Sequence, residues 1–274
     1  VAKILRSANI EYVKWDMNRQ LSDIGSSKLA SDQMGEYYHR YVLALYRMQE
    51  RLVTDFPKLL LENCSGGGAR FDPGMFYYSP QIWCSDDTDA IERLSIQEGT
   101  ALVYPLSTMG AHVSVCPNHA VGRVTPFKTR GYVALSGTFG YELDITKLSP
   151  EDRSLIPHQV ELYKKYSDLV RNGDYWRIAS FSQNHEYDCW MSVSKDKKEA
   201  LVTFVQVLNH PNFKTRFIKL QGLDPDRKYT VSFPDENQAD FPEITLFGST
   251  IMNAGIGIKR DWGDFQAKLI HIYS

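Results

Sequence analysis

The hydrophobic pattern of this chain changes near Gly173, and that change constrains the fold more than any other feature of the sequence. Before Gly173, short apolar runs alternate with segments of helical periodicity, which is typical of parallel βα units. After it, runs such as 201–205 and 268–273 alternate with period two between turn residues, which predicts an antiparallel β-sandwich. We therefore expect one domain over residues 1–172 and a second over residues 173–274.

Five apolar runs in the first part are expected to be strands. They cover residues 10–15, 58–63, 81–84, 101–104 and 131–136. Helices are expected over residues 32–54 and 150–172, the second interrupted at Pro157. Five βα units cannot close an eight-stranded barrel, which needs roughly 250 residues. Because the chain also begins as if inside a helix, we expect that three units precede it in a longer polypeptide.

The composition excludes several function classes. The net charge is −2 and no basic run is present, so nucleic acid is not an expected partner. No apolar stretch approaches the roughly 20 residues that span a membrane. The four cysteines, at positions 64, 84, 116 and 189, form no CxxC pair, which argues against a zinc site. We interpret them as reduced thiols of a cytoplasmic protein.

Three polar clusters follow predicted strands, at the end where the active sites of βα barrels lie. In the first cluster, Lys14 and Asp16 face the same side of a strand because strand side chains alternate. An ammonium beside a carboxylate favours the ionised form that a nucleophile needs. A structural ion pair at the end of the strand explains the same pattern.

The second cluster contains three aspartates, Asp86, Asp87 and Asp89. Carboxylates so close in sequence repel one another, which can raise the pKa of one of them toward the value that a general acid requires. The alternative is helix capping, in which Asp86 or Asp87 accepts amide hydrogen bonds from the following helix.

The third cluster is the glycine-rich loop from Asn63 to Arg70. Its glycines let the backbone approach a ligand closely, and the Gly-Lys-Ser/Thr ending of a phosphate loop is absent. A nucleophilic Cys64 has no obvious histidine partner along the chain. A tight turn without a ligand is the other interpretation of this loop.

Together these clusters resemble the α-galactosidases of glycoside hydrolase family 36, in the bacterial subgroup of long chains. The matching stretches are YVKWDMNR (residues 12–19), LENCSGGGARFDPGM (61–75), QIWCSDDTDAIERL (81–94), YPLSTMGAHVS (104–114) and LSGTFGYELD (135–144). The resemblance covers the whole α/β part and is weaker beyond it. It implies the C-terminal part of a (β/α)8 TIM barrel, the catalytic domain, followed by a β-sandwich.

The resemblance also implies the chemistry of a retaining α-galactosidase. Asp16 takes the place of the family's nucleophile and Asp86 that of its general acid/base. Substrate contacts are implied for Lys14, Trp15, Asn18, Cys64, Gly66 and Gly67. Cys64 would sense the substituent at C2 of the sugar, and Asp87 and Arg70 would be supporting residues. No metal or organic cofactor is implied.

The implied substrates are terminal α-D-galactosyl residues of oligosaccharides such as melibiose or raffinose, and the full-length form is expected to be a tetramer. The family holds galactose partly with residues from earlier strands and an N-terminal β-domain, so we expect little or no activity from the 274 residues alone. The alternatives are an α-N-acetylgalactosaminidase, against which Cys64 argues, a raffinose-type transglycosylase, and a non-catalytic carbohydrate-binding protein.

Overall fold

A computed structural model describes residues 1–18, 21–22, 24–67, 70–212 and 215–274. Arg19 of the first matching stretch, and Gly68 and Ala69 of the glycine-rich loop, lie outside these residues. The chain divides into two compact units, Val1–Asp86 and Asp87–Ser274. The domain boundary that the sequence predicts after residue 172 stays a prediction.

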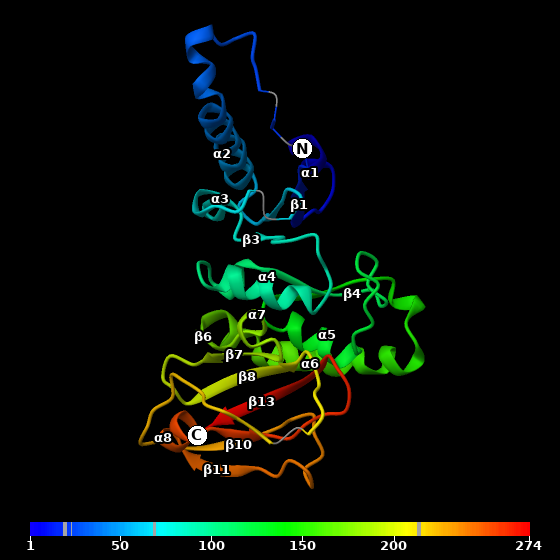
Figure 1. Ribbon diagram of the computed structural model, residues 1–274. Coiled ribbons are helices and arrows are strands. Elements are labelled where there is room, and N and C mark those ends of the chain that lie inside the picture. Colours follow the sequence, from blue (N-terminus) through cyan, green and yellow to red (C-terminus); the bar gives the residue numbers. More distant parts are fainter. Residues whose placement is uncertain (19–20, 23, 68–69, 213–214) are drawn as a thin grey trace. The chain divides into compact units, whose positions relative to one another are not determined.

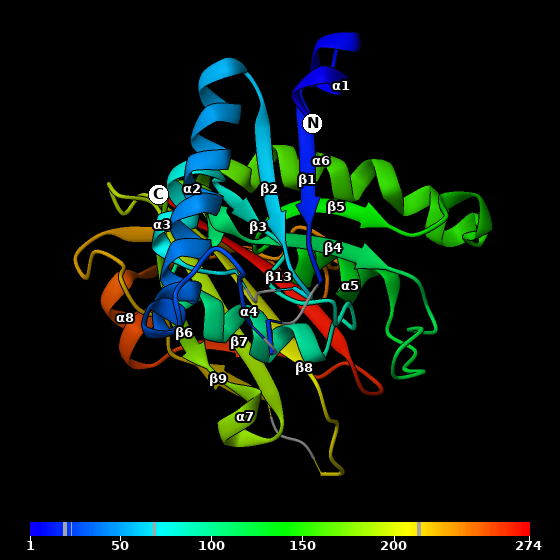
Figure 2. The same ribbon diagram turned by 90° about the horizontal axis from the view of Figure 1, so that it is seen from above.

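The first unit is built on a parallel sheet with the strand order β1-β2-β3. Its elements are α1 (Ala2–Ser7), β1 (Tyr12–Asp16), the 3-10 helix η1 (Ser31–Glu36), α2 (Tyr37–Asp55), β2 (Leu60–Cys64), α3 (Pro73–Tyr78) and β3 (Gln81–Ile82). Figure 2 shows β1 and β2 side by side, with their arrowheads pointing the same way. Parallel strands end at the same edge of a sheet, so the loops that follow β1, β2 and β3 meet there.

Local sequence signals explain the helices of the first unit. Helix α2 buries Leu45 and Leu52 on one face and ends just before the sequence Phe56-Pro57, because a residue that precedes proline disfavours helical geometry. Helix α3 has Pro73 in its first turn, and the Asp72 carboxylate accepts hydrogen bonds from the amides of the next turn.

The second unit begins with the remaining βα elements. These are α4 (Glu92–Ala101), the 3-10 helix η2 (Leu106–Thr108), β4 (Gly110–Ser114), α5 (Phe127–Ala134), β5 (Thr138–Glu142), the 3-10 helix η3 (Ile145–Lys147) and α6 (Pro150–Asn172). Strands β4 and β5 pair in parallel. In the described part of the chain, five parallel strands are each followed by a helix, which confirms the predicted βα units.

Two of the five predicted strands are wrong. Residues 101–104 lie at the end of α4 and in the turn that follows, and Leu102 and Val103 are exposed. Residues 131–136 lie in and just after α5, whose residues are almost all buried. A short apolar run buried on all sides carries no periodicity, so it cannot be told from a buried strand by sequence alone.

Helix α6 also differs from its prediction at Pro157. The helix runs through this proline from its cap at Ser149, whose hydroxyl accepts the Asp152 amide at 3.0 Å. Beyond the proline, α6 buries one face that includes Leu162, Tyr166 and Leu169. This tertiary packing offsets the backbone hydrogen bond that a proline cannot make.

The rest of the second unit is a six-stranded antiparallel sheet in the order β11-β10-β13-β8-β7-β6 (Figure 1), which confirms the predicted change of architecture. Its elements are β6 (Asp174–Ala179), α7 (Phe181–Asn184), β7 (Tyr187–Val193), β8 (Glu199–Gln206), β9 (Arg216–Ile218), β10 (Lys228–Ser232), β11 (Ile244–Phe247), α8 (Gly248–Asn253), β12 (Ile256–Ile258) and β13 (Gln266–Tyr273).

The antiparallel sheet is covered on both faces. Helices α5 and α6 contact β8 and β13. The β9–β12 ribbon and α8 contribute Ile218, Ile251 and Ile256 to the same core as β7, β8, β10 and β13, which completes a sandwich. Period-two alternation in these strands follows from this arrangement, because each strand turns successive side chains to opposite faces.

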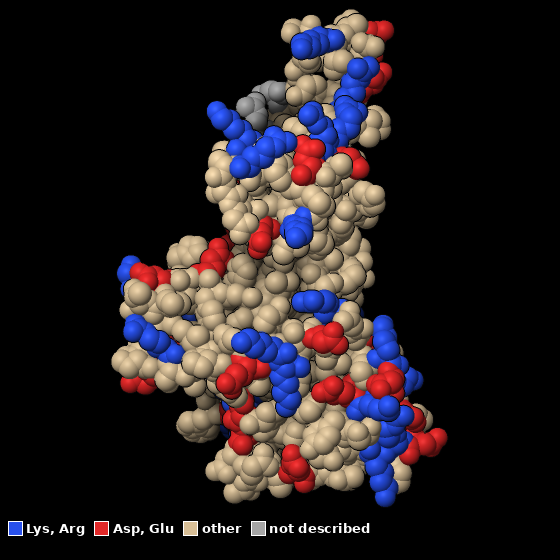
Figure 3. All heavy atoms as spheres, turned by 180° about the vertical axis from the view of Figure 1, so that it is seen from behind, with Lys and Arg blue, Asp and Glu red and all other residues tan. Residues whose placement is uncertain are grey.

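The surface mixes both signs of charge. On the face shown in Figure 3, Lys and Arg side chains lie next to Asp and Glu side chains over much of the molecule. Within the residues that the structure describes, no helix is long and apolar enough to cross a membrane. All four cysteines are free thiols, and two of them, Cys64 and Cys189, are buried.

Candidate active site

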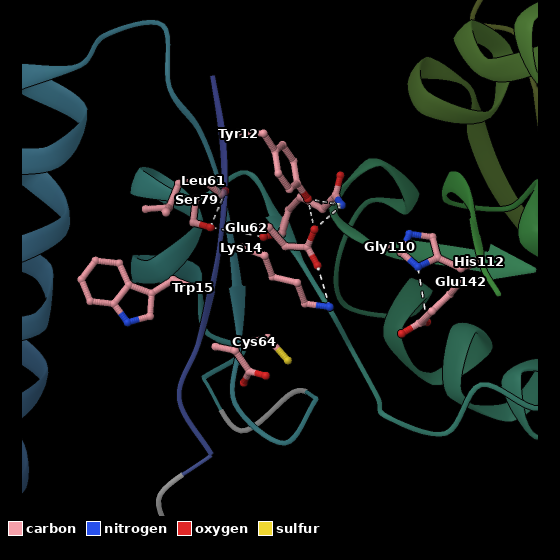
Figure 4. A network of polar contacts seen from close by, with 12 residues as sticks. Tyr12, Lys14, Trp15, Leu61, Glu62, Cys64, Ser79, Gly110, His112 and Glu142 are labelled. Carbon is pink, nitrogen blue, oxygen red and sulfur yellow. Dashed lines mark hydrogen bonds and ion pairs between the residues drawn. The ribbon is translucent and has the colours of Figure 1, made fainter. Parts of the chain in front are cut away.

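The register of the parallel sheet aligns the predicted site residues at the ends of β1 and β2. Lys14 is paired with Glu62 on the neighbouring strand, and Asp16 is paired with Cys64. Figure 4 shows the side chains of Lys14 and Cys64 on one side of these strands, whereas Trp15 points to the other side. Strand alternation therefore separates Trp15 from the group that Lys14 and Asp16 belong to.

Asn18 connects the Asp16 carboxylate to the glycine-rich loop. Its side-chain amide donates to Asp16 Oδ2 at 3.3 Å, and its Oδ1 accepts the Gly66 amide at 2.6 Å. The Asn18 side chain is thus anchored by backbone at one end and faces the carboxylate with its N–H group at the other. A hydrogen bond of this kind orients a carboxylate.

Cys64 is buried beside Asp16, and the pKa of its thiol is raised. Burial is the largest cause, and the negative charge of Asp16 and a hydrogen bond to Asp16 also raise the pKa. The hydrogen bond with the Gly67 amide and the positive charge of Lys14 lower it, but by less. A thiol that stays protonated at neutral pH is a poor nucleophile. This environment weighs against the interpretation of Cys64 as a nucleophile and leaves it as a small group beside Asp16.

The second glycine of the loop brings the backbone after β2 against the backbone after β3. Gly67 has φ +72°, and a Cβ there would lie 2.5 Å from Ser85 Cα and 3.0 Å from the Asp86 amide nitrogen. No residue with a side chain fits so close an approach. The main chain of Asp86 therefore abuts the loop that carries Cys64, and the Asp86 side chain is exposed.

Helix capping in the aspartate-rich cluster falls to Asp89, whereas the sequence pattern suggests Asp86 or Asp87 for that role. The Asp89 Oδ1 accepts the Ile91 amide at 3.0 Å and the Glu92 amide at 3.1 Å at the start of α4, and it also pairs with Arg123. The Asp89-x-x-Glu92 spacing, which resembles a capping box, is the signal that could have identified it. Asp87 instead accepts the Asp89 amide within the loop, at 3.0 Å.

Lys14 is held by two neighbours within the first unit. Its Nζ lies 3.6 Å from Glu62 Oε1 and 4.9 Å from the centre of the Trp83 ring. Its side chain is about a third exposed, whereas Glu62 is buried. Glu62 was not among the predicted site residues, although a lone charged residue in the apolar run Leu59-Leu60-Leu61-Glu62 is a usable signal.

Arg70 ties the ends of β1 and β2 together. Its Nη2 donates to the Trp15 carbonyl at 3.0 Å and to the Cys64 carbonyl, and burial lowers the pKa of its guanidinium. The side chain is buried and lines a cavity of about 510 Å³ in the first unit. Other residues that line it are Asn18, Tyr41, Ser65, Gly66 and Asp72. Arg70 supports the loop from within, as a structural residue does.

The candidate site is built from carboxylates, amides and one thiol. Among the residues that the structure describes, no group of three His, Cys, Asp or Glu side chains is arranged to hold a metal ion. Asp16 and the Asp86 backbone are brought to one edge of the sheet together with Lys14, Asn18, Cys64, Gly66 and Gly67. In glycoside hydrolysis, a pair of carboxylates on either side of the sugar acts as nucleophile and as proton donor.

Comparison with known proteins identifies relatives of the whole chain. The family model described as Melibiase matches residues 1–173, and the glycosyl hydrolase family 36 C-terminal domain matches residues 187–272. The α-galactosidase Mel36A of Lactobacillus acidophilus is 49% identical over 271 residues, which are 99% of this chain and 36% of the relative. The α-galactosidase AgaA of Geobacillus stearothermophilus is 52% identical over 266 residues, or 97% of this chain and 35% of AgaA.

Solved structures give the same result. The crystal structure of the family 36 α-galactosidase AgaB from Geobacillus stearothermophilus superimposes with a TM-score of 0.92 at 46% identity, over 99% of this chain and 36% of AgaB. This chain therefore spans about a third of the length of the relatives that it matches. It belongs to the melibiase family, glycoside hydrolase family 36, as the resemblance of its motifs indicates.

Proposed function

We propose that this chain carries the two catalytic carboxylates of a retaining α-galactosidase, with Asp16 as the nucleophile and Asp86 as the general acid/base. The observation that carries the proposal is their convergence on one loop. Asp16 is the register partner of Cys64, and Gly67, three residues further on, packs against the backbone of Asp86. Two residues far apart in sequence are thereby brought to one edge of the β1-β2-β3 sheet.

Two crystal structures of one relative, AgaA, support the assignment of these aspartates. Crystal structures of AgaA variants hold raffinose in one case and stachyose in the other, at 45% identity to this chain. Both variants carry the same change of an alanine to glutamate. In addition, the raffinose-bound variant has an aspartate changed to asparagine, and the stachyose-bound variant has an earlier aspartate changed to alanine. The number of positions between those two aspartates equals the number between Asp16 and Asp86.

The mechanism follows from the roles of two carboxyl groups. Protonated Asp86 donates its proton to the glycosidic oxygen while Asp16 attacks the anomeric carbon, which forms a β-galactosyl-enzyme and releases the alcohol. Asp86, now a carboxylate, removes a proton from water, which attacks the same carbon and releases α-galactose. Asn18 holds the Asp16 carboxylate at 3.3 Å, which suits a nucleophile that must stay ionised and oriented. Retention requires the two carboxyl groups to lie about 5–5.5 Å apart.

The substrates in this proposal are terminal α-D-galactosyl residues of raffinose-type oligosaccharides, the sugars that the AgaA variants hold. Activity, a tetrameric assembly and a cytoplasmic location are proposed for the polypeptide as it occurs naturally. Trp15 is the weakest of the proposed substrate contacts because its side chain points away from Lys14 (Figure 4). For the 274 residues alone, little or no turnover is expected.

A trapping experiment tests the proposal directly. A galactosyl fluoride with a second fluorine at C2 slows hydrolysis of the covalent intermediate, and peptide mapping of the labelled protein then locates the nucleophile. We expect the label on the peptide that contains Asp16, and its absence from the Asp16→Ala variant. Asp86→Ala should still accept label from the fluoride, because fluoride leaves without a proton donor, but it should fail on raffinose. Label on another residue, or none in an active preparation, contradicts the proposal.

The same preparation separates the rival functions. Turnover of the 4-nitrophenyl α-N-acetylgalactosaminide above that of the α-galactoside would favour the first rival. Galactosyl transfer to sucrose in excess of hydrolysis would favour the transglycosylase. Sugar binding without turnover or labelling would favour a carbohydrate-binding protein.

A further inference from the structure

A buried carboxylate lies at the centre of the polar network in Figure 4. Glu62 is only 2% exposed, yet it sits in the middle of the parallel sheet, with Lys14 as its register partner on β1 and Gln81 as its register partner on β3. Burying an isolated carboxylate is costly unless charge and hydrogen bonds compensate it. The contacts of Glu62 therefore indicate what the residue is for.

The two oxygens of Glu62 have different partners. Oε2 accepts the Tyr12 hydroxyl and, at 3.0 Å, the Gln81 side-chain amide. These two neutral donors come from the strands on either side, so they fix the plane of the carboxyl group. Oε1 lies 3.6 Å from Lys14 Nζ. The carboxylate is thus anchored through one oxygen and presents the other to the Lys14 ammonium.

The ammonium is held at the edge of the candidate active site. Lys14 lies two residues before Asp16 on β1, so both side chains are on the same face of the strand. The Lys14 Nζ also lies 4.9 Å from the centre of the Trp83 ring. A lysine side chain has four rotatable bonds, and fixing it in one conformation costs conformational entropy. Glu62 and Trp83 fix Lys14 before any ligand arrives, while a third of its side chain stays exposed to a ligand.

We propose that Glu62 is a positioning residue that holds the Lys14 ammonium for the galactosyl hydroxyls, with Tyr12 and Gln81 fixing Glu62 in turn. The inference rests on the proposed function, in which Lys14 contacts the sugar. Glu62 acts through Lys14 and is itself buried beneath it. A preorganised ammonium binds the sugar without a further loss of side-chain entropy, which lowers KM.

Glu62→Gln tests this role in the protein as it occurs naturally. The substitution keeps the shape and an acceptor for Tyr12 or Gln81 but removes the charge that attracts Lys14. We expect kcat/KM for a nitrophenyl α-galactoside to fall on the order of 10- to 100-fold, mainly through KM. Titration of active sites with the trapping fluoride puts each rate on a per-site basis, so a folding defect does not enter the comparison.

A double-mutant cycle with Lys14→Met separates positioning from a purely structural role. If Glu62 acts through Lys14, Glu62→Gln costs nothing more in kcat/KM once Lys14 is replaced. A structural role predicts that the two effects multiply. Tyr46→Phe is the matched stability control, because it removes a 2.6 Å hydrogen bond to Asp72 elsewhere in the same unit. It should lower the melting temperature and leave the per-site KM unchanged.

Gln81→Met carries the test if Glu62→Gln does not fold. It leaves both charges in place and removes one of the two donors that orient the carboxylate, so KM should rise by less than in Glu62→Gln. An unchanged per-site KM in Glu62→Gln, or multiplying effects in the cycle, overturns the positioning role. A wild-type protein without α-galactosidase activity, or one that keeps it in Asp16→Ala, refutes the proposed function instead.

Discussion

Asp16 and Cys64 end neighbouring parallel strands as register partners, so a carboxylate and a buried thiol lie side by side at the edge of the β1-β2-β3 sheet. The thiol is influenced by this neighbour, because the negative charge of Asp16 and the hydrogen bond to it add to the rise in the Cys64 pKa that burial causes. Cys64 therefore reports on the charge at position 16.

Thiol alkylation should be slow at Cys64 and should become faster when Asp16 loses its charge. The thiolate is the reacting species, so a raised pKa lowers the reactive fraction at pH 8. We expect iodoacetamide to modify Cys64 more slowly than a free cysteine of ordinary pKa. The Asp16→Asn variant should react faster, because it removes one cause of the raised pKa. Mass spectrometry of tryptic peptides gives both rates.

Cys189 is the internal control for this measurement. It is fully buried on β7, and burial raises its pKa well above the ordinary value. Its alkylation should be undetectable in native protein and equal in wild type and Asp16→Asn. An increase at both cysteines would mean that the substitution loosens the fold, and an unchanged rate at Cys64 would contradict the electrostatic coupling.

Gly67→Ala should destabilise the first unit more than Gly66→Ala. Both glycines have positive φ, +52° at Gly66 and +72° at Gly67, so alanine pays about 1–2 kcal/mol at either position. Only at Gly67 does a Cβ meet backbone, at 2.5 Å from Ser85 Cα, whereas the space at Gly66 is open. Urea unfolding should therefore show a loss larger by roughly 1–3 kcal/mol for Gly67→Ala. Equal losses of stability in the two variants would mean that the loop after β2 can move away from the loop after β3 without cost.

Local signals predicted much of the fold and part of the site. The helix predicted over residues 150–172 has both of its ends confirmed, with its cap at Ser149 and its stop at Gly173, although it runs through Pro157. The shared face of Lys14 and Asp16 also follows from strand alternation alone. Such features depend on residues that are neighbours along the chain, which is why they can be derived without a structure.

Features that depend on pairing between distant segments could not be predicted. The role of Glu62 depends on the register that sets it opposite both Lys14 and Gln81. Residues 131–134 of helix α5 were predicted as part of a strand because this helix, which contains Gly131, is buried on nearly all sides. The structure explains that glycine, since a Cβ there would lie 2.3 Å from Nε2 of Gln159 on α6.

Asp188→Asn should stabilise the second unit at alkaline pH. Asp188 is buried on β7, and burial, followed by the charge of Glu98, raises its pKa to about 7. In the unfolded chain its pKa is about 3.9, so ionisation penalises the folded state increasingly as pH rises from about 4 to 7. Asparagine carries no such penalty and can still accept the Phe181 amide. The gain should be on the order of 4 kcal/mol at pH 8 and near zero at pH 4.

Urea midpoints of Asp188→Asn and wild type, measured from pH 4 to pH 8, check this expectation. The gap between the two proteins should open as the pH rises and level off above the folded pKa. A gap of constant size would show that Asp188 does not change its ionisation over this range, and a loss of stability at pH 8 would show that its negative charge is needed in the fold.

Asp196→Asn should have the opposite pH dependence. Asp196 lies in the exposed turn between β7 and β8, where it accepts the Ser194 hydroxyl at 2.8 Å and the Lys198 amide at 3.1 Å. Led by the Ser194 hydrogen bond, these contacts lower its pKa to about 2.

Because this folded pKa of Asp196 lies below the unfolded value, the carboxylate stabilises the fold above about pH 4, and the effect is lost as pH falls through the folded pKa. Asp196→Asn should therefore be less stable than wild type at pH 7, with a gap that narrows below about pH 4. Carbon NMR of the Asp196 carboxyl gives the titration midpoint directly, and an ordinary midpoint near pH 4 would contradict the expected loss of stability.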